Sequence, residues 1–276
     1  MNGKGGNPAG VVLNADDLSY AEKLKIAQAV GYSETAFVSK DAEVDFEVSF
    51  FTVTDEVDFC GHATLAAFST LFSKKLISAG KYKQRTKAGI LAVNVDNNGH
   101  VVMEQACPTY LQTFKYKNIA NLIGIPLDIL SSTKLPVKVI STGLHDVIVP
   151  VPLGCLDKLQ VDNEKLSEFC EKHNLIGMHV FELNNSDSEF TASCRNFAPL
   201  LGIPEESATG SSSGALACYL AKHVFKDKES HDFIFEQGRA MGCGSRLSAS
   251  VQLENAQVSK VEVGGEAKET GVLYVS

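Results

Sequence analysis

Two short segments of this 276-residue chain bring side chains capable of acid–base chemistry to the start of a helix. The first reads D-F-C-G-H-A-T at 58–64, and the second reads A-T-G-S-S-S-G at 208–214. Each leads directly into a run of apolar residues, which predicts a buried helix. The first turn of a helix has unpaired N–H groups that, with the helix dipole, bind anions. If the two segments face each other, they could hold a carboxylate between them.

The first segment offers a thiol, an imidazole and backbone amides within one turn. His62 can bind a carboxylate or hydroxyl of a substrate, or carry a proton. Cys60 precedes Gly61 at the helix start, where the pKa of a thiol is lowered, so it could act as a base. The alternatives are a Cys60 that serves as a small buried apolar residue and a His62 bonded to the backbone.

Glu34 is the candidate proton carrier, in the segment S-E-T-A-F-V at 33–38. A carboxylate next to Ala36 and Phe37 is expected to be partly buried. Burial raises the pKa of a carboxylate and suits it to proton transfer near neutral pH. The alternative is an exposed glutamate at the start of a strand.

The second segment is preceded by two carboxylates, Glu205 and Glu206. We expect both at the N-terminal end of the second helix, its mouth, next to Thr209, Gly210 and Ser211. Acidic residues before a helix also stabilise its dipole, which is the alternative interpretation.

The hydrophobic pattern predicts strands and helices in an irregular order. Helices are expected at 18–30, 61–76 and 165–173 and after residue 209. Strands are expected at 34–39, 44–53, 81–95, 100–105, 136–140, 146–151, 178–183, 190–195 and 233–236 and within 247–276. The Asn98-Gly99 step predicts a hairpin. We expect one domain at 1–115 and a second at 116–276, which repeats the element order of the first.

The composition excludes several classes of function. The net charge of −8 argues against a nucleic-acid partner. No run of 18 apolar residues predicts a membrane span, and no signal-peptide core follows the start, so a cytoplasmic location is expected. The seven cysteines never form C-x-x-C, which favours reduced thiols and no metal site. No motif for a cofactor is present, because the G-N-P-A-G turn at 6–10 lacks the features of a nucleotide-binding loop.

Together these segments resemble the PhzF-like family of phenazine biosynthesis, which has the diaminopimelate epimerase fold. The matching pieces are GNPAGVV at 6–12, SETAFV at 33–38, EVDFCGHATLAA at 56–67, CRNFAP at 194–199 and GIPEESATGSSSG at 202–214. The segment E-Q-G at 236–238 is similar to a further family motif. The resemblance implies an α+β protein of two similar domains, each a barrel-like mixed sheet around a central helix, with the active site in the cleft between them.

The resemblance also implies roles for individual residues. Glu34 would move a proton between carbons of a small carboxylate-bearing substrate, without a cofactor or metal, in a protein expected to be a homodimer. The expected catalytic residues are Glu34, His62, Glu206 and Ser211. The expected substrate-binding residues are Cys60, Gly61, Thr209, Gly210 and Ser212.

Three features depart from the family pattern. Glu206-Ser207 stands where Asp-Pro is usual, and Cys243-Gly244 stands where Arg-Pro is usual, with Arg246 displaced. The chain also begins close to the G-N-P-A-G motif, so we expect the first family strand to be absent and a sheet edge to be open.

The leading hypothesis is therefore a cofactor-independent isomerase. One alternative is a catalytically silent member that binds a ligand or protein on the same scaffold. Another is an amino-acid epimerase or racemase that uses Cys60. The second helix has Thr209 where a two-thiol epimerase would need its other cysteine, which argues against a two-base mechanism.

Overall fold

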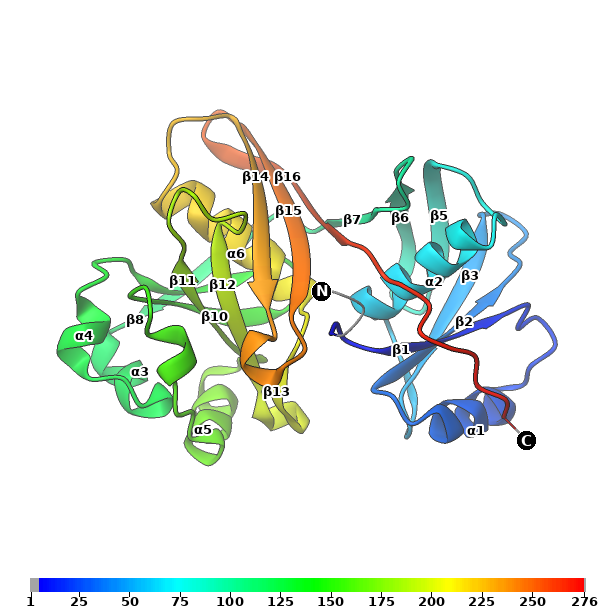
Figure 1. Cartoon of the computed structure of the whole chain (residues 1–276), viewed down its shortest axis with the longest axis horizontal. Helices are drawn as coiled ribbons and strands as arrows, with labels where there is room; N and C mark the ends of the chain where they lie inside the picture. Colours follow the sequence, from blue (N-terminus) through cyan, green and yellow to red (C-terminus); the bar gives the residue numbers. More distant parts are fainter. Residues whose placement is uncertain (1–4, 276) are drawn as a thin grey trace. The chain divides into compact units, whose positions relative to one another are not determined.

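The computed structural model describes residues 5–275, which form two compact units (Figure 1). The N-terminal unit consists of residues 7–104 and the returning segment 264–275. The C-terminal unit consists of residues 105–263 with residues 5–6. No helix in the described part of the chain has the length and apolar character needed to cross a membrane. None of the seven cysteines, which all lie in that part, forms a disulfide.

The N-terminal unit is a mixed sheet with two helices. Its elements are β1 (Ala9–Leu13), α1 (Tyr20–Val30), β2 (Glu34–Ser39), β3 (Phe46–Phe51), β4 (Glu56–Val57), α2 (Gly61–Ser73), β5 (Gly80–Thr86), β6 (Gly89–Val95) and β7 (Val101–Gln105). The strand order is β1-β2-β3-β5-β6-β7, and the short β4 pairs with β3. The pairs β1–β2 and β3–β5 are parallel, whereas β2–β3, β5–β6 and β6–β7 are antiparallel.

The C-terminal unit has a larger mixed sheet. Its elements are β8 (Thr109–Phe114), α3 (Tyr116–Ile123), α4 (Leu127–Ser131), β9 (Val137–Ser141), β10 (His145–Val151), η1 (Leu156–Lys158), α5 (Asn163–His173), β11 (Gly177–Leu183), β12 (Ala192–Ala198), η2 (Pro199–Leu201), β13 (Ile203–Glu206), α6 (Gly210–His223), β14 (Ser230–Gln237), η3 (Arg239–Met241), β15 (Ser245–Glu254) and β16 (Gln257–Gly265). The strand order is β16-β15-β14-β12-β11-β10-β9-β8, and β13 pairs with β12.

The two units repeat one topology, as the order of the sequence segments predicted. From β1 to β7 the N-terminal unit matches the C-terminal unit from β10 to β16, with α1 and α2 in the places of α5 and α6. The pairings agree as well, because β10–β11 and β12–β14 are parallel while β11–β12 and β14–β15 are antiparallel. In each unit a short strand, β4 or β13, comes just before the apolar helix. The segment from β8 to β9 has no counterpart among the described residues of the N-terminal unit.

Each apolar helix forms the centre of its own core. In α2, Ala63, Ala67 and Phe68 are fully buried against strands of the N-terminal sheet. Residues 212–221 of α6 are all buried in the C-terminal unit. Burying one phenylalanine side chain stabilises a fold by about 2 kcal/mol, so these helices anchor the units that carry them. Both predicted buried helices are therefore confirmed.

The two helices also begin alike. Neither cap residue, Cys60 or Thr209, uses its side chain to cap the first turn. Four residues later, Thr64 donates its hydroxyl to the Cys60 carbonyl at 2.9 Å, and Ser213 donates to the Thr209 carbonyl at 2.8 Å. The matching bonds show that the two helix starts are equivalent positions of the repeat.

Several boundaries differ from the sequence prediction. The single strand expected at 81–95 is wrong: it is two strands, β5 and β6, joined by a tight turn before Gly89, which has a φ of +117°. The hairpin after β6 is confirmed, with Val95 opposite Val101. The β-rich stretch expected at 247–276 ends at Gly265, and residues 266–275 have no regular secondary structure.

The division into units also differs from the expected boundary between residues 115 and 116. The change falls at residues 104–105, and the chain returns to the N-terminal unit after residue 263. In that returning segment Glu269 pairs with Lys74 at 2.9 Å, at the end of α2. The sequence pattern could not predict this return, because the returning segment has no regular spacing of apolar residues. The 1–115 and 116–276 division stays a prediction.

Candidate active site

Glu34 begins β2, at the point where the strand enters the core. The parallel register places it opposite Ala9 of β1, and the residues that follow it in β2 are buried. Its side chain is 20% exposed, so the carboxylate lies at the boundary between core and solvent. The expected partial burial is confirmed.

The cap and first turn of α2 lie against Glu34. His62 Nε2 is 3.2 Å from Glu34 Oε2, and His62 Nδ1 is 3.4 Å from Cys60 Sγ. The His62 side chain is only 14% exposed, and Cys60 is 7% exposed. Gly61 begins α2, so its backbone lies in the same turn. Four residues predicted for the site, Glu34, Cys60, Gly61 and His62, are thus neighbours in one unit.

The charges of this group stabilise each other. Burial alone would lower the pKa of His62, but its contacts with Cys60 and Glu34 outweigh burial and raise the pKa to about 10. Burial likewise acts to raise the pKa of Glu34, but the contacts with His62 and Ser33 outweigh it and hold the pKa below its usual value. The expectation that burial would raise the pKa of Glu34 is therefore wrong, because an imidazolium partner lies beside it. At neutral pH the pair is a carboxylate and an imidazolium.

One oxygen of Glu34 lacks a hydrogen bond. Oε2 is buried, and although His62 Nε2 is close, the geometry is that of an ion pair and not of a hydrogen bond. Buried polar atoms without a hydrogen bond are uncommon in proteins and call for an explanation. A proton or hydroxyl of a bound molecule would supply the missing partner.

The sequence interpretation missed Asn7. Its Nδ2 atom lies 3.4 Å from His62 Nδ1, so its amide is next to the imidazole. In the sequence, the G-N-P-A-G turn carried a match to the family but no role in the site. The signal was its place just before β1, whose neighbour β2 carries Glu34 at the same end.

The same three side chains could also hold a metal ion. Candidate ligand atoms of Glu34, Cys60 and His62 all lie within 4.8 Å of one another, the one such group among residues 5–275. Carboxylate, thiolate and imidazole together suit a zinc ion. That the reaction needs no metal ion stays a prediction, which proton exchange in the presence of a chelator tests.

The second helix mouth lies in the C-terminal unit. Glu206 ends β13, and its Oε2 accepts a hydrogen bond of 2.5 Å from the hydroxyl of Thr209, the cap residue of α6. Gly210 follows, and its carbonyl accepts a hydrogen bond from Gln105. Ser211 is half-buried in the first turn. Glu206, Thr209, Gly210 and Ser211 are thus neighbours, as predicted.

Ser212 lies deeper than a surface contact residue. Its side chain is fully buried, and its hydroxyl donates to Asp146 Oδ2 at 2.6 Å. Burial raises the pKa of Asp146, which the serine opposes in part. The side chain of Ser212 is therefore engaged within the protein, so only its backbone is available for the predicted role in substrate binding.

The two acidic residues expected at this mouth do not act as a pair. Glu205 forms a two-bond contact with Arg195, at 2.8 and 2.7 Å, whereas Glu206 bonds to Thr209. Neighbouring residues of a strand point to opposite faces, which separates the two carboxylates. Ser207, at the position usually occupied by proline, donates its hydroxyl to the Gly6 carbonyl at 3.0 Å. Arg246 pairs with the exposed Glu189.

Comparison with known proteins shows the family to which this chain is related. The family model described as "Phenazine biosynthesis-like protein" matches residues 2–270. An uncharacterized isomerase of Bacillus subtilis is 35% identical over 98% of this chain and 94% of its own length. The trans-2,3-dihydro-3-hydroxyanthranilate isomerase of Pseudomonas chlororaphis is 29% identical over 94% of this chain and 90% of its own.

Solved structures give the same result. A PhzF-family protein of Bacillus anthracis has a TM-score of 0.85 and 31% identity, covering 95% of this chain and 90% of that one. A probable proline racemase of Agrobacterium radiobacter, 10% identical, has a TM-score of 0.62 over 99% of this chain and 88% of that one, which shows likeness of fold alone.

The repeated mixed sheet around a central helix is the diaminopimelate epimerase-like fold, and the named relatives are isomerases, so the chain is an isomerase of this α+β fold. Within that class, the chain belongs to the PhzF family. The resemblance inferred from the sequence motifs is confirmed.

Proposed function

We propose that this isomerase moves a proton between two carbons of a small carboxylate-bearing metabolite, with Glu34 as the proton carrier and without a cofactor. The observation that carries the proposal is the buried Glu34 Oε2, which has no hydrogen bond and lies beside the His62 imidazolium. A carboxylate that is ionised in the free protein is ready to accept a proton from carbon.

The chemistry balances without an added reagent. Glu34 takes a proton from one carbon, and the electrons of that C–H bond move into the conjugated system and the carboxylate, forming an enolate. The protonated Glu34 then returns the proton to a second carbon, so the double bond moves and Glu34 is a carboxylate again. Positive charge at His62 and backbone amides at Gly61 stabilise the enolate, and one such donor contributes about 3 kcal/mol in well-studied enzymes.

The residues of the second helix mouth complete the proposal. Glu206 and Ser211 would contact the substrate, and backbone amides at Gly210 and Ser212 would bind its carboxylate. The position of the active site between the two units stays a prediction. The name of the Pseudomonas relative gives a first candidate substrate, a dihydroaromatic carboxylic acid.

The direct test is proton exchange with solvent. The protein is incubated in D2O with trans-2,3-dihydro-3-hydroxyanthranilate and with a panel of unsaturated and amino acids, in the presence of EDTA. We expect deuterium at carbon in at least one compound, detected by NMR and mass spectrometry, because the proton that Glu34 holds in the enolate complex exchanges with D2O before it returns to carbon. A compound that binds tightly while no compound exchanges would instead favour the silent binding protein.

Cys60 provides the second candidate function, a one-thiol epimerase, because its sulfur is 3.4 Å from the imidazole. Under our proposal the Cys60 thiol transfers no proton to or from the substrate. Cys60→Ala is therefore expected to retain proton exchange within about tenfold of wild type. The residual loss comes from its contact with His62. If Cys60→Ala lost as much of the exchange rate as a Glu34 variant, the thiol would be the group that transfers the proton.

The assembly and location are proposals as well. We propose a homodimer in the cytoplasm. Light scattering during size-exclusion chromatography checks the first, and fractionation of the source cells checks the second.

A further inference from the structure

Gln237, the last residue of β14, makes three hydrogen bonds to the mouth of α6. Its Oε1 accepts from the Thr209 N–H at 3.2 Å, and its Nε2 donates to the Glu206 carbonyl at 2.7 Å and to Thr209 Oγ1 at 2.9 Å. The side chain is 1% exposed. Because an N–H can only donate and a carbonyl can only accept, these partners determine which end of the amide faces which atom.

This arrangement gives the hydrogen bonds a direction. Thr209 has one hydroxyl proton, and its oxygen already accepts a proton from Gln237. The hydroxyl proton therefore points to Glu206 Oε2, 2.5 Å away. A chain of donors thus runs from Gln237 through Thr209 to the Glu206 carboxylate and fixes the position of that carboxylate.

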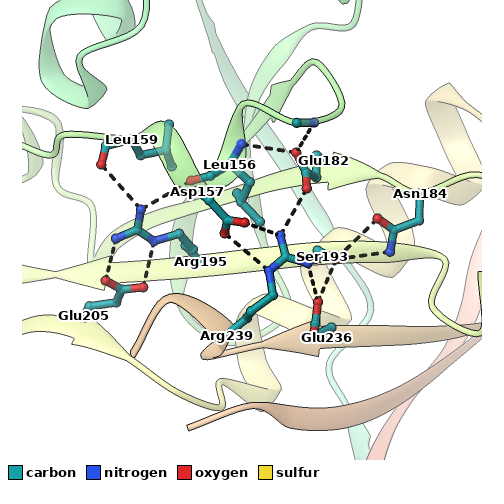
Figure 2. A network of polar contacts seen from close by, with 11 residues as sticks. Leu156, Asp157, Leu159, Glu182, Asn184, Ser193, Arg195, Glu205, Glu236 and Arg239 are labelled. Atoms are coloured by element: carbon teal, nitrogen blue, oxygen red, sulfur yellow. Dashed lines mark hydrogen bonds and ion pairs between the residues drawn. The ribbon is translucent and has the colours of Figure 1, made fainter. Parts of the chain in front are cut away.

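The end of β14 is itself held by a network of charges (Figure 2). Glu236 Oε2 accepts hydrogen bonds from Arg239 at 2.7 Å and from Ser193 at 3.0 Å. Arg239 also contacts Asp157 at 3.0 Å and Glu182 at 3.3 Å, so one guanidinium joins three carboxylates. Glu236, the residue before Gln237, is therefore bonded to Ser193 of β12 and, through Arg239, linked to η1 and β11.

Gly238 lets the strand end approach the helix mouth. It has a φ of +84°, and a Cβ atom there would lie 2.5 Å from the Cys243 carbonyl oxygen and 2.9 Å from that of Ser207. Only glycine fits such a position without displacement of the backbone. Each residue of the E-Q-G segment thus has a physical role: Glu236 anchors, Gln237 bonds to the mouth of α6, and Gly238 permits the close approach.

We propose that Gln237 is a positioning residue that orients Glu206, through Thr209, and fixes the first turn of α6 for substrate binding. The inference rests on the proposed function for its catalytic consequence. Its structural part, that Gln237 holds the start of α6, stands on the three bonds alone.

The kinetic test compares two variants that break the chain with one that preserves it. Gln237→Met has a similar length but no polar group, and Thr209→Val keeps the shape of threonine without the hydroxyl. Each is expected to lose about 10²-fold in kcat for proton exchange, since a carboxylate displaced by about 1 Å costs that much. The double variant is expected to be no worse than either single one, because the residues act as a unit. Thr209→Ser keeps the hydroxyl that donates to Glu206 and is expected to lose clearly less kcat than Thr209→Val.

Gln252→Met is the matched control, because Gln252 is an exposed residue of β15 in the same unit. It is expected to behave as wild type. Wild-type kcat in Gln237→Met would overturn the proposal, and so would equal losses in Thr209→Ser and Thr209→Val.

Amide hydrogen exchange gives a second measurement that needs no substrate. Gln237→Met frees the Thr209 N–H, so its exchange is expected to accelerate at least about tenfold while amides in the buried part of α6, such as Leu216, remain unchanged. Equal acceleration along all of α6 would mean general destabilisation and would contradict a positioning role. If wild type moves no proton on any compound, the proposed function fails while this measurement still decides whether Gln237 holds the helix mouth.

Discussion

Replacing Glu34 by glutamine is expected to reduce proton exchange at carbon by about 10³-fold, equivalent to about 4 kcal/mol of transition-state stabilisation. Glutamine has nearly the same shape, but its amide cannot accept and return a proton. This carboxylate has a buried oxygen that makes no hydrogen bond, and it lies next to a cation that favours its ionised form. Its loss removes the proton carrier and leaves substrate binding through backbone amides intact.

The measurement is the rate of deuterium incorporation under substrate saturation, with the Kd for the same compound determined by calorimetry. Glu34→Asp keeps the charge but withdraws the carboxylate by one methylene group, so an intermediate loss of about 10²-fold is expected. Glu47→Gln, at an exposed position of the neighbouring strand β3, is the matched control and is expected to match wild type. A Glu34→Gln protein that exchanges as fast as wild type would exclude Glu34 as the proton carrier.

The sequence was sufficient for the elements whose signals are local. The apolar runs after Gly61 and Gly210 predicted two buried helices because a helix that is apolar on all sides must be buried. The Asn98-Gly99 step predicted the hairpin because its turn needs residues that tolerate positive φ, and Gly99 has a φ of +82°. Likewise, the order of segments predicted the repeated topology of the two units.

Features that depend on contacts distant in the sequence could not be predicted in this way. The pKa of Glu34 is an example: its local neighbours indicated burial, but His62, 28 positions later, reverses the effect of that burial. Asn7 and Gln237 are others, because their partners are 55 and 28 positions away. An asparagine in a glycine-rich turn and a glutamine at the end of a strand carry no local signal for such contacts.

The separation of Glu205 from Glu206 is another feature that the sequence did not predict. Two adjacent carboxylates before a helix suggested a common role, yet the alternation of a strand sends one to Arg195 and the other to Thr209. The short strand β13 has too few residues for its alternation to be recognised from sequence. Only the pairing of β13 with β12 determines which carboxylate faces the helix mouth.

The contribution of His62 to stability is expected to decline as pH rises from about 6.5 to about 10. Its pKa is raised from 6.5 in the unfolded chain to about 10 in the folded protein. Below pH 6.5 His62 is protonated in both states, so the stabilisation is fully present. Above pH 6.5 the unfolded chain loses the proton first, and the stabilisation is lost as the pH approaches the folded pKa. A shift of this size corresponds to at most about 5 kcal/mol.

The measurement is the difference in unfolding free energy between wild type and His62→Gln, obtained by calorimetry at intervals from pH 6 to pH 10. Taking the difference removes the titration of lysines, tyrosines and the other thiols, which both proteins share. Wild type is expected to be several kcal/mol more stable at pH 6, and the advantage is expected to shrink steadily toward pH 10. Glu34 and Cys60 both raise the pKa of His62, so Glu34→Gln is expected to flatten the same curve in part. A constant difference across the range would show that His62 has its ordinary pKa, and Glu34 would then lack the cation that keeps it ionised beside the substrate.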